Sequence, residues 1–155
     1  MGTATGFGLA YAKAELGAGE ALPTNGAVFL STHDRDKPAL LPVAQRLAQL
    51  GFRLTATEGT ARTLQAAGLV VETVLKVHEG RPNIEDAIRS GEIQLVINTP
   101  VGRQAAHDDK YLRRAAIDYA VTTVTTLAGA RAAVEGIAAL QAQEMQVRAL
   151  QDIHG

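Results

Sequence analysis

The sequence predicts an α/β fold: a doubly wound, five-stranded parallel sheet with helices on both faces, three layers deep. Five short apolar runs alternate along the chain with stretches whose apolar residues recur at helical spacing. The runs are nearly continuous in apolar residues, which is typical of strands covered on both faces. The 155 residues, 46% of them hydrophobic and 20% charged, are typical of one globular domain with a sizeable core.

Residues 1–26 differ from the regular pattern that follows them. Residues 7–16 have helical apolar spacing, and residues 17–26 contain the glycines and the proline of a linker. A helix this short would bury little surface by itself. We therefore expect 1–26 to be the tail of a preceding unit and its linker, and 27–155 to form the domain.

From Ala27 onwards each expected strand is followed by an expected helix. The expected strands are 27–31, 52–56, 70–75, 93–97 and 121–124. The expected helices are 38–50, 61–67, 83–89, 108–119 and 128–153. Glycines close several of these helices, and Gly136 could interrupt the last one.

The stretch from Phe52 to Thr63 carries the clearest functional pattern. A strand is followed by Thr57, Gly59 and Thr60 and then by the start of a helix. The first N–H groups of a helix have no partner within it, and the helix dipole is positive there. The pattern predicts a phosphate site to which the two threonine hydroxyls add donors. An ordinary capped turn between strand and helix would show the same pattern.

The loops after parallel strands meet at the carboxyl edge of a sheet, where ligands bind. Here those loops hold Lys37, Thr57, Thr60, Lys76, Arg81, Asn98, Thr99 and Arg103. Two lysines and two arginines around a threonine turn favour a phosphorylated small molecule. Polar loops also occur in any α/β domain.

Composition argues against several classes of protein. The net charge of −1 gives no bulk attraction to nucleic acid or membrane, and 4% aromatic content argues against stacking on RNA bases. No apolar run reaches the ~20 residues of a membrane span, and the start lacks a signal-peptide pattern. The absence of cysteine excludes disulfides and is typical of a cytoplasmic protein. We expect a cytoplasmic location, without nucleic acid or membrane as partner.

Other polar pairs give weaker indications. His33 and Asp34 are expected to form part of a solvated loop, and His78 has no second residue at metal-ligand spacing. Asp108 stands at a helix start, where acidic residues are common, and could reach a ligand hydroxyl. The residues alone indicate an anion pocket with no metal and no evident catalytic machinery.

Residues 74–82 (Val-Leu-Lys-Val-His-Glu-Gly-Arg-Pro) and 95–100 (Leu-Val-Ile-Asn-Thr-Pro) carry a specific resemblance. Through them the chain resembles the C-terminal regulatory domain of the carbamoyl-phosphate synthetase large subunit, a methylglyoxal-synthase-like domain. The resemblance runs from about residue 25 to 137. Residues 1–23 resemble the tail of the preceding synthetase domain, which implies a fragment of a much larger subunit.

The resemblance implies a regulatory function in arginine and pyrimidine biosynthesis. The whole enzyme is an ATP-dependent ligase that uses Mg or Mn and takes ammonia from a glutaminase small subunit. The domain resembled here binds allosteric effectors, the nucleotides UMP and IMP, and ornithine near the synthetase junction. The domain itself is implied to be non-catalytic and to hold no cofactor.

The resemblance also implies roles for particular residues. Family positions for the nucleotide phosphate fall on Lys37, Thr57, Thr60 and Lys76, and those for the ribose and base fall on Ser31, Asn98, Thr99 and Asp108. Thr125 keeps an ornithine contact, whereas Thr123 stands where a relative has tyrosine. The ornithine response is therefore less secure than nucleotide binding.

Methylglyoxal synthase, which eliminates phosphate from dihydroxyacetone phosphate, is the alternative within the same superfamily. It needs a carboxylate base after the third strand, where this chain has Arg81, and an aspartate after the fourth, where the chain has Pro100. Without a base, general base catalysis has no agent. The resemblance thus implies the binding half of that site without the catalytic half.

The last expected helix carries four apolar residues that its own sheet could cover. These are Leu140, Met145, Val147 and Leu150. If they are exposed, the helix could pair with a second copy of the chain and form a homo-oligomer.

Overall fold

The computed structural model describes the backbone of residues 22–99 and 103–154, with side chains for 22–99 and 107–150. Its strands are β1 (Ala27–Thr32), β2 (Arg53–Ala56), β3 (Val71–Thr73), β4 (Leu95–Thr99) and β5 (Thr122–Val124). Its α-helices are α2 (Lys37–Gln49), α3 (Glu58–Ala66), α4 (Ile84–Arg89), α5 (Arg103–Asp118) and α6 (Leu127–His154). Two 3₁₀ turns, η1 (Asp34–Asp36) and η2 (Val77–Glu79), follow β1 and β3.

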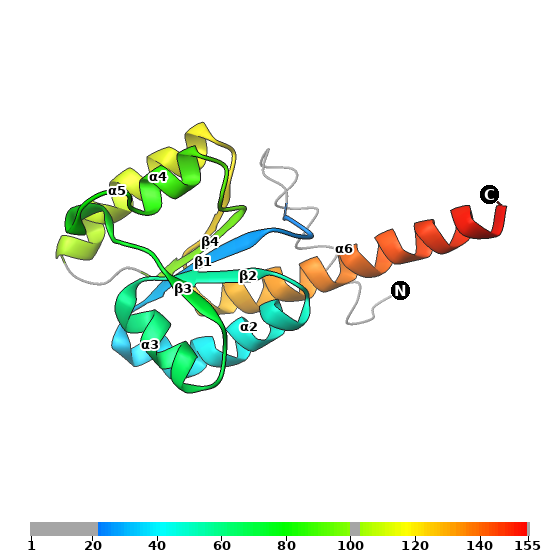
Figure 1. The fold of residues 1–155 in the computed structure, drawn as a ribbon, viewed down its shortest axis with the longest axis horizontal. Helices are drawn as coiled ribbons and strands as arrows, with labels where there is room; N and C mark the ends of the chain where they lie inside the picture. The colour runs from blue at the N-terminus through cyan, green and yellow to red at the C-terminus, as the bar shows by residue number, and fades with distance from the viewer. Residues whose placement is uncertain (1–21, 100–102, 155) are drawn as a thin grey trace.

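The strands form one parallel sheet in the order β3-β2-β1-β4-β5. Helices α2, α3 and α6 lie on one side of the sheet and α4 and α5 on the other (Figure 1). This arrangement confirms the predicted three-layer, doubly wound α/β fold. The chain leaves β1 in one direction for β2 and returns on its other side at β4, so a topological switch point lies between β1 and β4.

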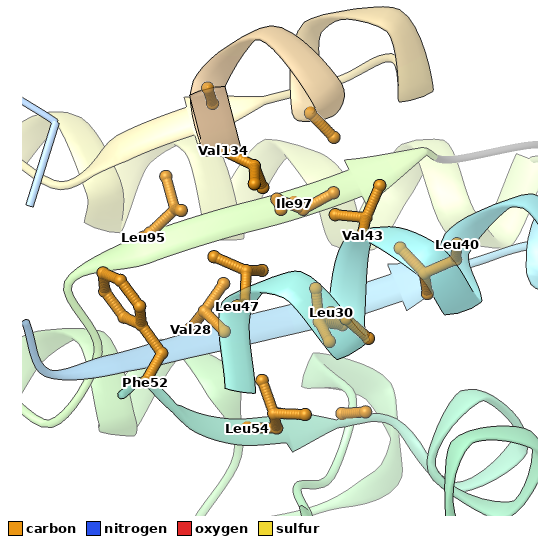
Figure 2. Close-up of a cluster of buried hydrophobic side chains, with 14 of the residues drawn as sticks. Val28, Leu30, Leu40, Val43, Leu47, Phe52, Leu54, Leu95, Ile97 and Val134 are labelled. Atoms are coloured by element: carbon orange, nitrogen blue, oxygen red, sulfur yellow. The ribbon is translucent and has the colours of Figure 1, made fainter. Parts of the chain in front are cut away.

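Strand β1 shows why the apolar runs are continuous. Successive side chains point to opposite faces, and a helical layer covers each face. Val28 and Leu30 join the cluster shared with α2 and α6. Figure 2 labels both residues, together with Leu47 of α2 and Val134 of α6. Phe29, between Val28 and Leu30, joins the second cluster beneath α4 and α5. All three are almost fully buried.

Several element boundaries differ from those expected. α3 begins at Glu58 rather than residue 61, because Thr57 takes the N-cap position. α6 runs without a break through Gly136, so the expected interruption is wrong. Gly136 is buried in the packed face of α6, and that packing outweighs the ~1 kcal/mol that glycine costs in a helix.

The residues just before β1 pack on the domain. Leu22 is buried in the larger core cluster, and Gln141 Nε2 on α6 donates a 2.8 Å hydrogen bond to Thr24 O. The helix expected over 7–16 lies outside the described residues, and the boundary at 26 stays a prediction. None of the described helices is both long and apolar enough to cross a membrane.

Helix α6 continues past the sheet (Figure 1). Leu140 is half-buried against the core, so this residue is covered by its own domain and not left for a second copy of the chain. Met145, Val147 and Leu150, further along, are exposed. Pairing with a second copy stays a prediction.

Candidate ligand pocket

A pocket of about 360 Å³ opens at the carboxyl edge of the sheet, at the switch point between β1 and β4. It is lined by Phe29, Ser31, Thr32, His33, Asp34, Lys37, Thr57, Lys76, Val77, His78, Ile84, Asn98, Thr99, Asp108, Asp109 and Leu112. These residues come from β1 and β4, the first residues of α2 and α4, the N-cap of α3, the turns η1 and η2 with the residues just before them, and α5. The pocket therefore lies where the fold predicts a ligand.

The floor of the pocket is formed by the last residues of two neighbouring strands. Ser31 pairs in register with Asn98, and Thr32 pairs with Thr99. The hydroxyls of Thr32 and Thr99 are buried and find no hydrogen-bond partner among the described residues. Buried polar groups are nearly always satisfied, so we expect an ordered water to be the partner of these two hydroxyls beneath the pocket floor.

One wall is the N-terminus of α3. The first backbone bond of this helix runs from Ala61 N to Thr57 O at 2.7 Å, so the N–H groups of residues 58–60 precede it and remain available. Thr57 Oγ1 lies 3.3 Å from Ser31 Oγ beside them. A Cβ on Gly59 would lie 3.5 Å from Lys37 Nζ, which places that ammonium over the first turn of α3. Backbone donors, hydroxyls and a cation therefore converge here, as in an anion site.

Lys37 is held in place by Asp34. The ammonium forms an ion pair with Asp34 Oδ1; the Lys37 side chain is 14% exposed, whereas the Asp34 side chain is 98% exposed. The hydrogen bond and charge of Lys37 hold the pKa of Asp34 below its ordinary value. An anionic ligand could take the place of Asp34 as the partner of the Lys37 ammonium. Breaking the Lys37–Asp34 pair would cost little free energy, because ion pairs with an exposed partner are weak.

Two histidines with acidic partners also line the pocket. His78 Nδ1, in η2, pairs with Asp108 Oδ2 in α5. His33 Nε2 lies 2.9 Å from Asp36 Oδ2. Both histidines line the pocket, and the expected solvated loop keeps the Asp34 side chain 98% exposed and that of His33 28% exposed. The sequence indicates these two histidines only through their position, because both follow strands in segments at the carboxyl edge of the sheet.

Asn98 and Asp109 form a buried pair at the β4 end of the pocket. Asn98 Nδ2 donates a 3.0 Å hydrogen bond to Asp109 Oδ1, and Arg113 Nε lies 2.7 Å from Asp109 Oδ2. Asp109 is not among the predicted site residues, because an acidic residue near a helix start is common. Only the fold shows that it faces Asn98.

Most of the predicted site residues meet in this pocket. The lining residues that were predicted are Ser31, Lys37, Thr57, Lys76, Asn98, Thr99 and Asp108. Thr60 and Thr125 are not among the lining residues, and the side chain of Arg103 lies outside the described part of the chain.

Two of the expected donors are turned away. Thr60 Oγ1 accepts from Thr32 N at 3.3 Å and lies 3.4 Å from Thr32 O, so this buried hydroxyl ties α3 to β1 instead of facing a ligand. The expectation that Arg81 converges on the pocket is wrong as well. Arg81 pairs with Asp86 in the first turn of α4 and is not among the residues that line the pocket.

Metal binding has no support in the described part of the chain. No group of three or more histidine, cysteine, aspartate or glutamate side chains in these residues is arranged to hold a metal ion. The chemistry that the described pocket offers is hydrogen bonding, charge pairing and a histidine beside a carboxylate.

The sheet order and the pocket at its carboxyl edge are those of a doubly wound α/β domain, and the family model of the MGS-like domain matches residues 39–125. The chain belongs to the MGS-like domain family. In the structural comparison, methylglyoxal synthase from Elizabethkingia anophelis matches with a TM-score of 0.59 and 21% identity, over 73% of this chain and 79% of that one. ForH matches with a TM-score of 0.53 and 18% identity, over 83% and 93%. At these identities the likeness shows the fold alone.

Curated relatives are carbamoyl phosphate synthase large chains. That of Acidobacterium capsulatum is 52% identical over 99% of this chain and 14% of its own length. That of Nostoc sp. is 49% identical over 98% of this chain, again 14% of its own length. The C-terminal section of the large chain of Methanopyrus kandleri is 49% identical over 99% of this chain and 29% of that protein. The resemblance to the C-terminal MGS-like domain of these large chains is confirmed.

Proposed function

We propose that this domain binds a small phosphorylated effector, a nucleoside monophosphate such as UMP or IMP, and regulates a carbamoyl phosphate synthase large chain. One observation carries the proposal: the ammonium of Lys37 lies over the N-terminus of α3, beside the hydroxyls of Ser31 and Thr57. A phosphate there would receive charge-assisted hydrogen bonds, which are about twice as strong as neutral ones. The pocket volume of about 360 Å³ suits a ligand larger than phosphate alone.

Lys76 supplies the second cation of this proposal. It precedes η2 and lines the same pocket as Lys37, and its backbone N–H donates to Glu79 Oε1 at 2.7 Å. That bond fixes the start of η2 without engaging the ammonium. Two lysines approaching from separate loops suit a dianionic phosphate better than one does.

Regulation follows from differential binding. An effector shifts the populations of two states of a large chain only if it binds one of them more tightly. The proposed setting is a large chain that works with a glutaminase small subunit in arginine and pyrimidine biosynthesis, with ATP and Mg or Mn used by other parts of that chain. Ornithine would bind elsewhere, because Thr125 does not line this pocket.

A second function, elimination of phosphate from dihydroxyacetone phosphate, is favoured by one observation. His78 lines the pocket and its Nδ1 is paired with Asp108, which leaves Nε2 as a candidate base. Against it, the residue at the expected carboxylate position, Arg81, is an exposed cation paired with Asp86. The regulatory function is therefore the one that the geometry supports better.

Calorimetric titration of the 155-residue chain with UMP, IMP, ornithine and dihydroxyacetone phosphate tests the proposal. We expect saturable binding of a nucleotide and no formation of methylglyoxal. Lys76→Ala should weaken nucleotide binding about tenfold, the value of one charge-assisted hydrogen bond. Lys110→Ala is the matched control, since Lys110 is exposed on α5 and does not line the pocket.

Each contrary outcome has a distinct meaning. Equal nucleotide affinity in the parent and in Lys76→Ala would remove Lys76 from the site. Turnover of dihydroxyacetone phosphate would overturn the regulatory function in favour of the lyase.

A further inference from the structure

The orientation of the Asn98 side chain is fixed by its partner. Asn98 lies at the end of β4, is 8% exposed and lines the pocket. Its amide meets the carboxylate of Asp109 at 3.0 Å. A side-chain amide has one donor end and one acceptor end, and its direction follows from what it faces. Because an ion-paired carboxylate only accepts, the nitrogen of Asn98 must face Asp109, and the carbonyl oxygen is left for the pocket.

Asp109 is itself held from a second direction. Arg113, one turn further along α5, approaches Oδ2 to 2.7 Å, while Oδ1 takes the Asn98 amide. Asp109 is 9% exposed, and a carboxylate this sheltered requires partners for its oxygens. With one partner on each oxygen, the carboxylate can neither rotate nor release Asn98 without leaving a buried group unsatisfied.

We propose that Asp109 is a positioning residue that presents the Asn98 carbonyl oxygen to the ligand. This inference rests on the proposed function and names the feature that the ligand needs beyond its phosphate. The ligand must carry a hydrogen-bond donor, a hydroxyl or an N–H, at the end that meets β4 and α5. Sugar hydroxyls and the N–H of uracil or hypoxanthine both qualify.

The proposal makes the pocket polar from end to end. Lys37 and the α3 N-terminus present positive charge and donors, whereas the Asn98 carbonyl presents an acceptor. Inorganic phosphate can use the first end alone, and a nucleotide uses both. A substitution that alters only the acceptor end should therefore lower the affinity for the nucleotide and not that for phosphate, whereas damage to the whole pocket should lower both affinities.

The test compares UMP and inorganic phosphate binding to Asp109→Asn with binding to the parent, by calorimetry on the 155-residue chain. An asparagine at 109 can donate or accept, so the Asn98 amide is no longer forced into one direction. The matched control is Asp118→Asn, which removes the same charge from the last residue of α5, where Asp118 lies 3.9 Å from Arg89. The second readout is the Asn98 side-chain amide in the ligand-free chain, followed by NMR hydrogen exchange.

We expect Asp109→Asn to weaken UMP three- to tenfold relative to phosphate, the range of one hydrogen bond. The Asn98 amide should exchange faster in this variant, and Asp118→Asn should match the parent in both readouts. An unchanged ratio of UMP to phosphate affinity in Asp109→Asn would overturn the proposal, as would an equal loss of both ligands. If the parent binds no nucleotide, the proposed function fails, and an unchanged Asn98 amide in Asp109→Asn would overturn the inference independently.

Discussion

Two side-chain amides at opposite ends of β4, Gln94 at the amino edge of the sheet and Asn98 at the carboxyl edge, are used in opposite ways. Gln94 Oε1 accepts from Ala27 N at 2.6 Å and its Nε2 donates to Gly91 O at 2.8 Å, so both ends are bound to backbone. Asn98 donates from its nitrogen to Asp109 and lines the pocket, where we propose that its oxygen meets the ligand. The amide at the amino edge is therefore fully used by the fold, whereas the amide at the carboxyl edge keeps an acceptor that the proposed ligand can use.

The amino edge has further bonds of the same kind. Gln141 Nε2 on α6 donates to Thr24 O at 2.8 Å and to Leu50 O at 2.9 Å, tying three separate segments together. At the carboxyl edge, the hydroxyls of Thr32 and Thr99 have no partner among the described residues. The difference implies that mutations at the two edges should separate stability from binding.

The largest effect on stability is expected from Gly26→Ala at the amino edge. Gly26 has a φ of +114°, and an added Cβ would lie 2.2 Å from Gln94 Oε1. Relief would require Gln94 to leave Ala27 N, so we expect a loss of about 2–4 kcal/mol from backbone strain and broken hydrogen bonds. Urea unfolding measures the loss, and UMP affinity of the folded fraction should not change. A variant as stable as the parent would show that the Gln94 contact does not matter.

The largest effect on binding is expected from Lys37→Met at the carboxyl edge. Removing the ammonium over the α3 N-terminus should cost about 2 kcal/mol in nucleotide affinity, roughly thirtyfold. The free energy of unfolding should change by less than about 0.5 kcal/mol, because the Asp34 partner is exposed. Calorimetry and urea unfolding of one preparation give both numbers. A large loss of stability with unchanged nucleotide affinity would show that Lys37 at the carboxyl edge stabilises the fold and does not bind the ligand.

Gln94→Met sharpens the comparison with a smaller change. The substitution keeps the size of the side chain and removes the bonds to Ala27 N and Gly91 O. We expect a loss of about 1–2 kcal/mol of stability, since each hydrogen bond contributes about 1 kcal/mol net. Thermal unfolding with and without UMP should show the same ligand-induced rise in Tm for variant and parent.

The smallest effect is expected from Asp86, which contributes to the dependence of stability on pH in the acid range. The hydrogen bond from Arg81, and then that from Asn83 N, hold the pKa of Asp86 below its ordinary value of 3.8 in the folded domain. The carboxylate therefore stabilises the fold above pH 3.8, and this contribution is lost as the pH falls through the folded-state pKa. Asp86→Asn should flatten the decline of stability below pH 4, as measured by urea midpoints at pH 3 to 7. An unchanged decline would mean that other carboxylates cause it.

The sheet and its ligand edge could be predicted because they depend on local patterns. A continuous apolar run such as residues 27–30 indicates a strand between two layers, and a glycine and threonine turn before a helix indicates an anion site. The pairs across the pocket could not be predicted. His78 and Asp108 are 30 residues apart, and only the fold brings η2 against α5.

The two residues that were predicted to reach the pocket but do not line it, Thr60 and Arg81, are both held by partners that the sequence does not show. Thr60 is on the predicted turn, but a helix that starts three residues early rotates its hydroxyl onto β1. Arg81 is on a carboxyl-edge loop, but an acidic partner in the first turn of α4 holds it. Spacing along the chain gives the edge on which a residue lies, and local partners decide whether its side chain reaches the ligand.

The most direct test is an NMR titration of the ¹⁵N-labelled 155-residue chain with UMP. The amides of Glu58, Gly59 and Thr60 at the start of α3, and that of Asn98, should shift in saturable fashion, while those of Gln94 and Gln141 stay in place. This result would place the nucleotide at the carboxyl edge. Shifts confined to the amino edge, or none at saturating UMP, would contradict the assignment of the pocket as an effector site.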